Sequence, residues 1–306
     1  MKFQLSSWII AATSLTSFHP TSVDAVGGGL RSPDRRLQNG NAYGKWKKCV
    51  VLLKEVQLLD GELEEVDCYD QETKMYNRLS AELEDKVKKD FKNGKAKSGS
   101  TTMNADGTYE TNGDGRRVLH VSDVDSITYE DFVPEQHGRR LASVGDKEML
   151  AIRVVADDAS TTATEAEISD SWFGTDGDTV NLKSQYSACS YDALRCNAAS
   201  MTMGNGAEVT DGVFEVSITN TVSGVDNGVI RNAVVTAAED ALGVTLSSRT
   251  YFDHVMLCLP PGTSGGWIGY AYINWYLSVY NDNWCNYVSI QMHGESYFYT
   301  IPSFVS

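Results

Sequence analysis

The sequence predicts a protein of the α+β or α/β class, in which helices flank a mixed β-sheet. The chain has 306 residues, of which 42% are hydrophobic and 22% are charged, and this composition is typical of a folded protein with a sizeable core. Within residues 141–306, strand-like apolar runs alternate with helix-like segments. The alternation lacks the single crossover rhythm of a purely parallel sheet, so we expect a mixed sheet.

The charge balance and the hydropathy exclude two classes of partner. The formal net charge is −15, because 41 acidic residues outnumber 26 basic ones. A nucleic-acid interface needs a basic face, so we expect no nucleic-acid partner. No apolar run reaches the ~18 residues that a membrane-spanning helix needs, so we also expect no membrane span.

Residues 1–25 are predicted to be a signal peptide. Lys2 supplies the positive start, an apolar stretch begins at Trp8, and Val23 and Ala25 occupy the −3 and −1 positions of a cleavage site. The six cysteines are an even number, which favours an oxidising compartment where they can pair. We therefore expect a secreted, extracellular protein.

The distribution of charge divides the remaining chain into two units. Residues 26–140 carry 19 basic and 21 acidic residues, whereas residues 141–306 carry 6 and 19. A polar stretch at about 94–118, rich in Gly, Ser, Thr and Asn, is expected to be a linker. Arg139 and Arg140 form a dibasic pair before the second unit, and this pair is either a processing site or a solvated charge pair.

The first unit is predicted to contain a hairpin followed by a helix. An apolar run at 49–53 predicts a buried strand, which continues through a turn at 60–61. Cys49 and Cys68 flank this hairpin, and a disulfide between them is more plausible than a thiolate that blocks a metal. Apolar residues recur every fourth position along a charged helix: Met75, Leu79, Leu83, Val87 and Phe91.

The second unit supplies the predicted mixed sheet. The apolar patterns predict helices and strands in alternation, and a last helix that begins near residue 281 and runs to residue 293. Strands are expected at 149–156, 212–218, 251–259, 267–272 and 275–280, and earlier helices at 164–171, 182–194 and 229–242. The aromatic residues between 267 and 280 are expected to belong to the core rather than to a substrate platform.

Four cysteines and one histidine of this unit have predicted structural roles. Cys258 and Cys285 border the strand-to-helix end of the unit and are expected to pair. A Cys189–Cys196 disulfide is possible, but the sequence leaves the connectivity open. His254 is expected to be a structural or surface residue rather than a metal ligand.

Three segments within about residues 148–293 carry a distinctive pattern. They are 181–190 (NLKSQYSACS), 254–263 (HVMLCLPPGT), and 266–293 with its GWIGYAYIN, LSVYN, Trp284-Cys285 and Gln291-Met292-His293 elements. Together, and in this order, they resemble the gametolysin family of secreted algal zinc metallopeptidases, which belong to the metzincin class. The resemblance implies a metzincin-like upper subdomain, incomplete at the C-terminus, after a propeptide-like region at 26–140. It also implies a zinc cofactor and a protein substrate such as an extracellular matrix glycoprotein.

The zinc-binding motif of that class is broken in this sequence. A metzincin carries H-E-x-x-H-x-x-G-x-x-H, because histidines at i and i+4 share a helix face around one zinc and the Glu is the general base. His293 stands at the first position, and the other required positions hold Gly294, Tyr297, Thr300 and Ser303. Glu295 lies one place too late, which turns it by about 100° around a helix.

Three interpretations follow from the incomplete motif. The chain is a precursor (zymogen) of a metalloendopeptidase that is inactive as it stands, a non-catalytic binding or decoy module, or a truncated gene model of an active peptidase. The third interpretation rests on the abrupt change of character after His293, where a turn and an aromatic run replace the expected helix. The genomic sequence downstream of that residue, read in all frames, discriminates among them.

Overall fold

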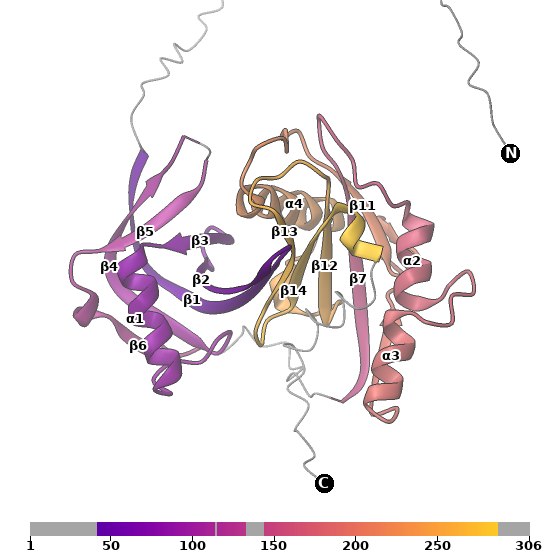
Figure 1. Cartoon of the computed structure of the whole chain (residues 1–306), viewed down its shortest axis with the longest axis horizontal. Helices are drawn as coiled ribbons and strands as arrows, with labels where there is room; N and C mark the ends of the chain where they lie inside the picture. The colour runs from indigo at the N-terminus through magenta and orange to yellow at the C-terminus, as the bar shows by residue number, and fades with distance from the viewer. Residues whose placement is uncertain (1–41, 114, 133–143, 287–306) are drawn as a thin grey trace, which may run out of the picture. The chain divides into compact units, whose positions relative to one another are not determined.

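The N-terminal part of the chain forms a closed five-stranded barrel in a computed structural model that describes residues 42–113, 115–132 and 144–286 (Figure 1). The pairings run from the first strand through the second, third, fifth and fourth and return to the first, and only the third and fifth strands are parallel. The strands are β1 (Ala42–Leu58), β2 (Gly61–Asp70), β3 (Met75–Leu79), β4 (Thr101–Thr111) and β5 (Arg117–Val121).

One helix and one short strand complete this N-terminal barrel. Helix α1 (Ala81–Lys92) connects β3 to β4, and together with the strand order this is the arrangement of the OB-fold. A short 3-10 helix, η1 (Val124–Ser126), precedes β6 (Thr128–Asp131), which pairs with β4. Leu83 and Val87 of α1 are fully buried among the apolar side chains of the barrel, and a disulfide joins Cys49 in β1 to Cys68 in β2.

Two sequence predictions for this region differ from the structure. The middle of the stretch expected to be a linker is strand β4, whose polar residues are held by pairing with β1, β5 and β6. The four-residue apolar spacing describes a helix only from Leu83 onward, because Met75–Leu79 is strand β3 and Ser80 is the helix N-cap. In both places pairing between distant strands outweighs the local pattern.

The C-terminal part contains the predicted mixed sheet. Its parallel strands are β7 (Gly145–Val155), β8 (Leu194–Ala198), β11 (Val213–Ser217), β12 (His254–Leu259) and β14 (Leu277–Asn281), whereas β13 (Trp267–Tyr272) runs antiparallel to β14. A separate two-stranded sheet is formed by β9 (Met201–Thr202) and β10 (Glu208–Val209).

Capping residues set the ends of the helices in this part. Helix α2 (Glu165–Phe173) begins with a capping box between Thr164 and Glu167 and ends at Gly174, whose φ is 72°. Helix α4 (Asn227–Leu242) is capped by Asp226 and ends at Gly243, whose φ is 69°. The end of α4 matches the predicted helix end at residue 242.

Helix α3 is shorter than predicted. It spans Leu182–Cys189 rather than reaching residue 194, because Tyr191 and Asp192 adopt positive φ angles of 52° and 61° that no α-helix accommodates. The chain then turns and Leu194 begins β8, which pairs with the first half of β7.

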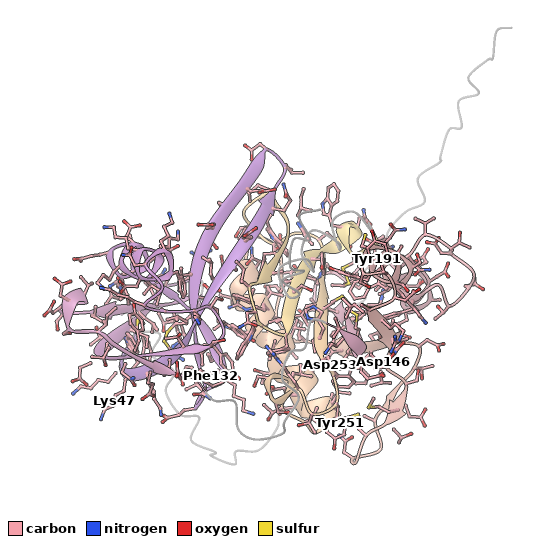
Figure 2. All side chains as sticks on the ribbon, turned by 90° about the horizontal axis from the view of Figure 1, so that it is seen from below. Lys47, Phe132, Asp146, Tyr191, Tyr251 and Asp253 are labelled. Atoms are coloured by element: carbon pink, nitrogen blue, oxygen red, sulfur yellow. A yellow bond between two sulfur atoms is a disulfide. The ribbon has the colours of Figure 1, made fainter. Side chains whose placement is uncertain are left out.

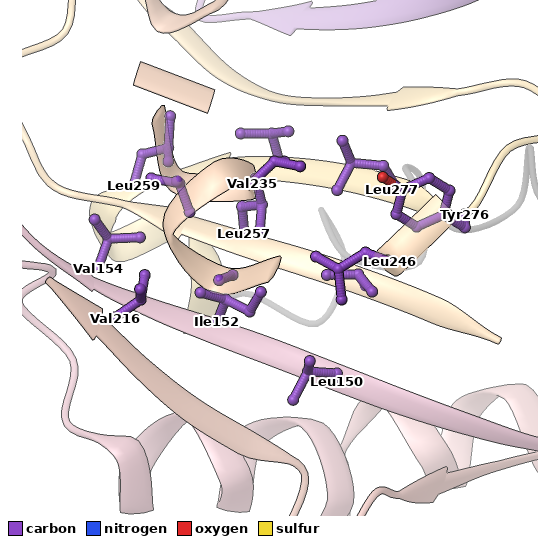
Figure 3. Packing of buried hydrophobic residues seen from close by; sticks show 14 of the residues in the cluster. Leu150, Ile152, Val154, Val216, Val235, Leu246, Leu257, Leu259, Tyr276 and Leu277 are labelled. Carbon is purple, nitrogen blue, oxygen red and sulfur yellow. The ribbon is translucent and has the colours of Figure 1, made fainter. Parts of the chain in front are cut away.

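The mixed sheet separates two hydrophobic clusters, one on each face. Leu150, Ile152 and Val154 of β7 pack with α4 (Figure 3), whereas Met149 and Ala151 pack on the other side with α2 and α3. This division follows from the alternation of side chains along a strand. The face covered by α4 also receives side chains from the barrel, since Val50, Leu52, Val56, Tyr69 and Tyr76 belong to the same cluster.

The barrel and the mixed sheet are continuous through one strand pair. The second half of β1 pairs antiparallel with β13, with Lys54 opposite Tyr272 and Leu58 opposite Trp267. The combined sheet has twelve strands, and all described residues belong to one compact unit. Among the described residues, none of the helices combines the length and the apolarity needed to cross a membrane.

Candidate metal centre

The described chain approaches the expected metal ligand through a short 3-10 helix. This helix, η3 (Asp282–Asn286), follows β14 directly, and Asp282 makes the turn with a φ of 44°. The predicted last helix is therefore a 3-10 turn as far as it is described. His293 and Glu295 lie outside the described residues, as do Arg139 and Arg140.

One disulfide and three hydrogen bonds fix η3 to the face of the sheet that carries α2 and α3. A disulfide joins Cys285 to Cys258 in β12. The indole Nε1 of Trp172 in α2 donates to the carbonyl oxygen of Cys285 over 2.5 Å. The carboxylate of Asp282 accepts hydrogen bonds from the backbone N–H and the hydroxyl of Thr162, at 2.8 and 3.0 Å.

The side chain of Thr161 adds a hydrogen bond to Cys258, the residue of β12 to which η3 is bonded. The hydroxyl of Thr161, which is fully buried, donates to the carbonyl oxygen of Cys258 over 2.6 Å. The last described residue, Asn286, precedes His293 by seven positions. The chain that leads to the candidate ligand thus starts from a rigid point on the α2 side of the sheet.

His254 has the structural role that the sequence predicted. It is 1% exposed in β12, and its Nε2 lies 3.1 Å from the hydroxyl oxygen of Ser278 in the adjacent strand β14. The preceding residue, Asp253, accepts a hydrogen bond from the backbone N–H of Glu148 over 2.9 Å. These contacts hold the start of β12 against its neighbours.

The donor groups of the described residues do not make a zinc site. Within these residues no three His, Cys, Asp or Glu side chains gather in a way that could hold a metal, whereas stable zinc sites use three or four ligands. Cys49 and Cys68 are bonded to each other, and so are Cys258 and Cys285, so none of these four sulfurs is a thiolate ligand. No disulfide joins Cys189, which is exposed on α3, to Cys196, which is buried in β8.

Comparison with known proteins identifies the C-terminal part. A sequence model of gametolysin peptidase M11 matches residues 154–300. Residues 154–300 belong to the gametolysin peptidase family M11. The match confirms the resemblance found in the sequence, and the members of this family are in general zinc metallopeptidases. No curated protein and no solved structure matches the chain.

In the M11 region, as we call residues 144–286, the aromatic residues between 267 and 280 are core residues as predicted. The six aromatic residues between 267 and 280 are at most 2% exposed, and five of them belong to the cluster on the α4 face. They are Trp267, Tyr270, Tyr272, Trp275, Tyr276 and Tyr280. The barrel lies outside the matched range, yet two of its tyrosines pack in the same cluster.

A buried ion cluster between the barrel and the M11 region was not predicted from the sequence. Asp67 in β2 and Arg231 in α4 are 1% and 2% exposed, and Oδ2 of Asp67 lies 3.0 Å from Nη1 of Arg231. The Nζ of Lys54 in β1 lies 3.2 Å from the same oxygen, and the hydroxyl of Tyr272 in β13 donates to it over 2.6 Å. Arg78 and Glu65 form a second ion pair beside the first.

Electrostatics keep Asp67 ionised despite its burial. Burial alone raises the pKa of this carboxyl, but Lys54, Arg231 and Arg78, with the Tyr272 hydrogen bond, outweigh it and hold the pKa well below its usual range. One feature of the sequence indicated a buried charge here, because Arg231 is the only basic residue of the mainly apolar helix α4. Its partner lies 164 residues away and could not be named from the sequence.

Proposed function

We propose that the chain is a secreted, gametolysin-like metallopeptidase homologue that does not hydrolyse peptide bonds as it stands. One observation carries this proposal. The M11 match extends through His293, but the positions of the general base and of the second histidine hold Gly294 and Tyr297. A zinc peptidase needs the base to take a proton from the metal-bound water and needs at least three protein ligands for the metal.

Secretion is supported by the predicted signal peptide and by the two disulfides. Structural disulfides persist in oxidising compartments and are rare in the cytosol. The two bonds, Cys49–Cys68 and Cys258–Cys285, lie in different parts of the fold, so both the barrel and the M11 region have the chemistry of an exported protein. The protein partner inherited from an extracellular peptidase ancestor is a matrix protein or glycoprotein.

The N-terminal region at 26–140 is proposed to be the propeptide-like part of the chain, with Arg139–Arg140 as its processing site. Two features support this role. The region precedes the M11 match, and its barrel occupies the edge of the M11 sheet through the β1–β13 pair. Mass spectrometry of the protein secreted by its native cells gives the N-terminus of the mature chain, and a start at Leu141 is the expected result.

The proposal is tested by zinc content and by proteolysis. The purified full-length chain is incubated with a fluorescent protein substrate, with and without a chelator, and its zinc is measured by mass spectrometry. We expect less than one tightly bound zinc per chain and no chelator-sensitive cleavage. The matched control is His293→Ala, which leaves the background unchanged if the chain has no zinc chemistry.

Chelator-sensitive cleavage that disappears in His293→Ala would show that the proposal is wrong. A variant with the motif restored, Gly294→Glu with Tyr297→His and Ser303→His, shows whether the fold still accepts the metal. Transcript sequencing downstream of His293 addresses the remaining interpretation. A transcript that encodes Glu, His, Gly and His at the family spacing would show that the protein is an active peptidase and not an inactive homologue.

A further inference from the structure

We propose that the N-terminal barrel and the M11 region form a stable two-part assembly that stays together after the chain between residues 132 and 144 is cut. The interaction surface of the M11 region consists of the edge of β13 that faces away from β14 and one face of α4, and its partner is the barrel of the same chain. This inference rests on the described contacts and does not depend on the proposed catalytic state.

Backbone pairing supplies the first part of the surface. Five residues of β1, from Lys54 to Leu58, pair with β13 and satisfy the edge of the M11 sheet. The connection continues beyond the strands, because the backbone N–H of Ile273 donates to the carbonyl oxygen of Leu53 over 2.8 Å. The hydroxyl of Ser98 donates to the carbonyl oxygen of Ile273 over 2.7 Å. Separation would leave these backbone groups without protein partners.

Aromatic packing supplies the second part of the surface. The rings of Tyr76 in β3 and Tyr272 in β13 stack with their centroids 5.4 Å apart, and Tyr69 in β2 lies at the same distance from Trp275. The hydroxyl of Tyr76 donates to that of Tyr276 over 2.9 Å and accepts from the indole of Trp275 over 3.0 Å. Each large aromatic side chain buries about 150–250 Å², so this contact resembles a domain core divided between two partners.

Buried charges make the surface specific. Asp67 of the barrel faces Arg231 of the M11 region, as described above, and Arg116 in the β4–β5 connection pairs with Asp226, the N-cap of α4. The two pairs have opposite polarity across the interface, since the carboxylate belongs to the barrel in one pair and to α4 in the other. Such alternation rejects partners that present the wrong charge.

The barrel uses for this contact the face with which OB-type barrels bind their ligands. In such barrels strands 2 and 3 and the connections between strands 1 and 2 and strands 4 and 5 form the binding face. Asp67 lies in β2, Tyr76 in β3 and Arg116 in the β4–β5 connection, and each of them contacts the M11 region. The ligand of this barrel is therefore the M11 region itself.

The test uses the full-length chain with a recognition sequence for a sequence-specific protease inserted between Gly138 and Arg139. After complete cutting, which a denaturing gel verifies, the protein is examined by size-exclusion chromatography and native mass spectrometry. We expect both fragments to elute together at the position of the uncut chain, with the mass of a 1:1 complex. Elution of the two fragments at separate positions under native conditions would overturn the proposal.

A charge reversal tests the specific contact. Asp67→Arg places a cation against Arg231 and Lys54, and we expect the dissociation constant of the cut fragments to rise by about 30-fold or more. The double variant Asp67→Arg with Arg231→Asp is expected to recover part of this loss. Association of the Asp67→Arg fragments that is as tight as in the parent would show that the ion cluster does not hold the assembly.

The matched control makes the same substitution at an exposed aspartate. Asp146, labelled in Figure 2, has a side chain that is 59% exposed and pairs with Arg195 within the M11 region. Asp146→Arg is expected to leave the association of the cut fragments unchanged. Circular dichroism of each uncut variant verifies that it folds, and if Asp67→Arg does not fold, the result with the cut parent chain still decides the proposal.

Discussion

Asp67 of the barrel and Arg231 of helix α4 form an ion pair of 3.0 Å that is almost completely buried, although 164 residues separate them in the chain. Lys54 and Tyr272 bind the same carboxylate oxygen. A buried carboxylate of this kind is stable only with several partners. The pair therefore links the folding of the two parts of the chain.

We predict strong energetic coupling between these two residues. Asp67→Asn or Arg231→Met alone leaves a buried charge without its main partner and lowers the free energy of unfolding by about 3–5 kcal/mol. The double variant is expected to lose less than the sum of the two single variants. Urea denaturation of the four proteins gives the coupling, and strictly additive losses would contradict the prediction.

The stability of the protein is predicted to fall in acid through Asp67. The pKa of Asp67 is well below its usual range in the folded protein, so its stabilisation is complete above the unfolded-state pKa of about 3.9. The stabilisation is lost progressively as the pH falls from there toward the folded-state pKa. Urea midpoints measured from pH 7 down to pH 2 should therefore fall more steeply for the parent than for Asp67→Asn. Parallel profiles would show that Asp67 does not contribute.

Removal of the Cys258–Cys285 disulfide is predicted to destabilise the M11 region. The bond closes a loop between residues 27 positions apart, and loss of such a bond typically lowers the free energy of unfolding by about 2–4 kcal/mol. The variant is Cys258→Ala with Cys285→Ala, and guanidinium denaturation measures the change. Cys189→Ala is the matched control, because this exposed cysteine forms no disulfide.

The hydroxyl groups of Tyr76 and Tyr276 are predicted to contribute unequally to the free energy of unfolding. Tyr76→Phe removes the acceptor of the Trp275 indole and the donor to Tyr276, so it should lower the free energy of unfolding by about 1–3 kcal/mol. Tyr276→Phe removes only one of these bonds and should lower it by about 1 kcal/mol. Thermal and urea unfolding compare the two, and a larger loss in Tyr276→Phe would contradict the prediction.

Local patterns predicted the M11 region better than the barrel. Helix α4 was expected at 229–242 and spans Asn227–Leu242, because its apolar spacing and its terminal glycine act within the helix itself. Strands β12 and β13 were predicted for the same reason, since continuous apolar runs indicate burial on both faces. Strand β4 was missed because its pairing with β1 joins residues that are distant in sequence.

The sequence predicted the motif of the candidate metal centre, but not the contacts that hold the neighbouring helix η3 in place. The residues around Trp284 and His293 carry the family resemblance, and the M11 match confirms the family. The anchoring of η3 depends on Trp172 and Thr162, which lie more than 100 positions upstream and carry no local signal of that role. The ion cluster escaped prediction for the same physical reason, because its members come from five different elements.

Strand β1 serves two sheets at once, since residues 42–50 pair with β4 and residues 54–58 pair with β13. Successive side chains of a strand alternate between its faces, so a single inserted or deleted residue between these halves would invert one of them relative to the other. Length variation in this segment is therefore incompatible with both pairings. The length of this one strand therefore fixes both the closure of the barrel and its attachment to the M11 sheet.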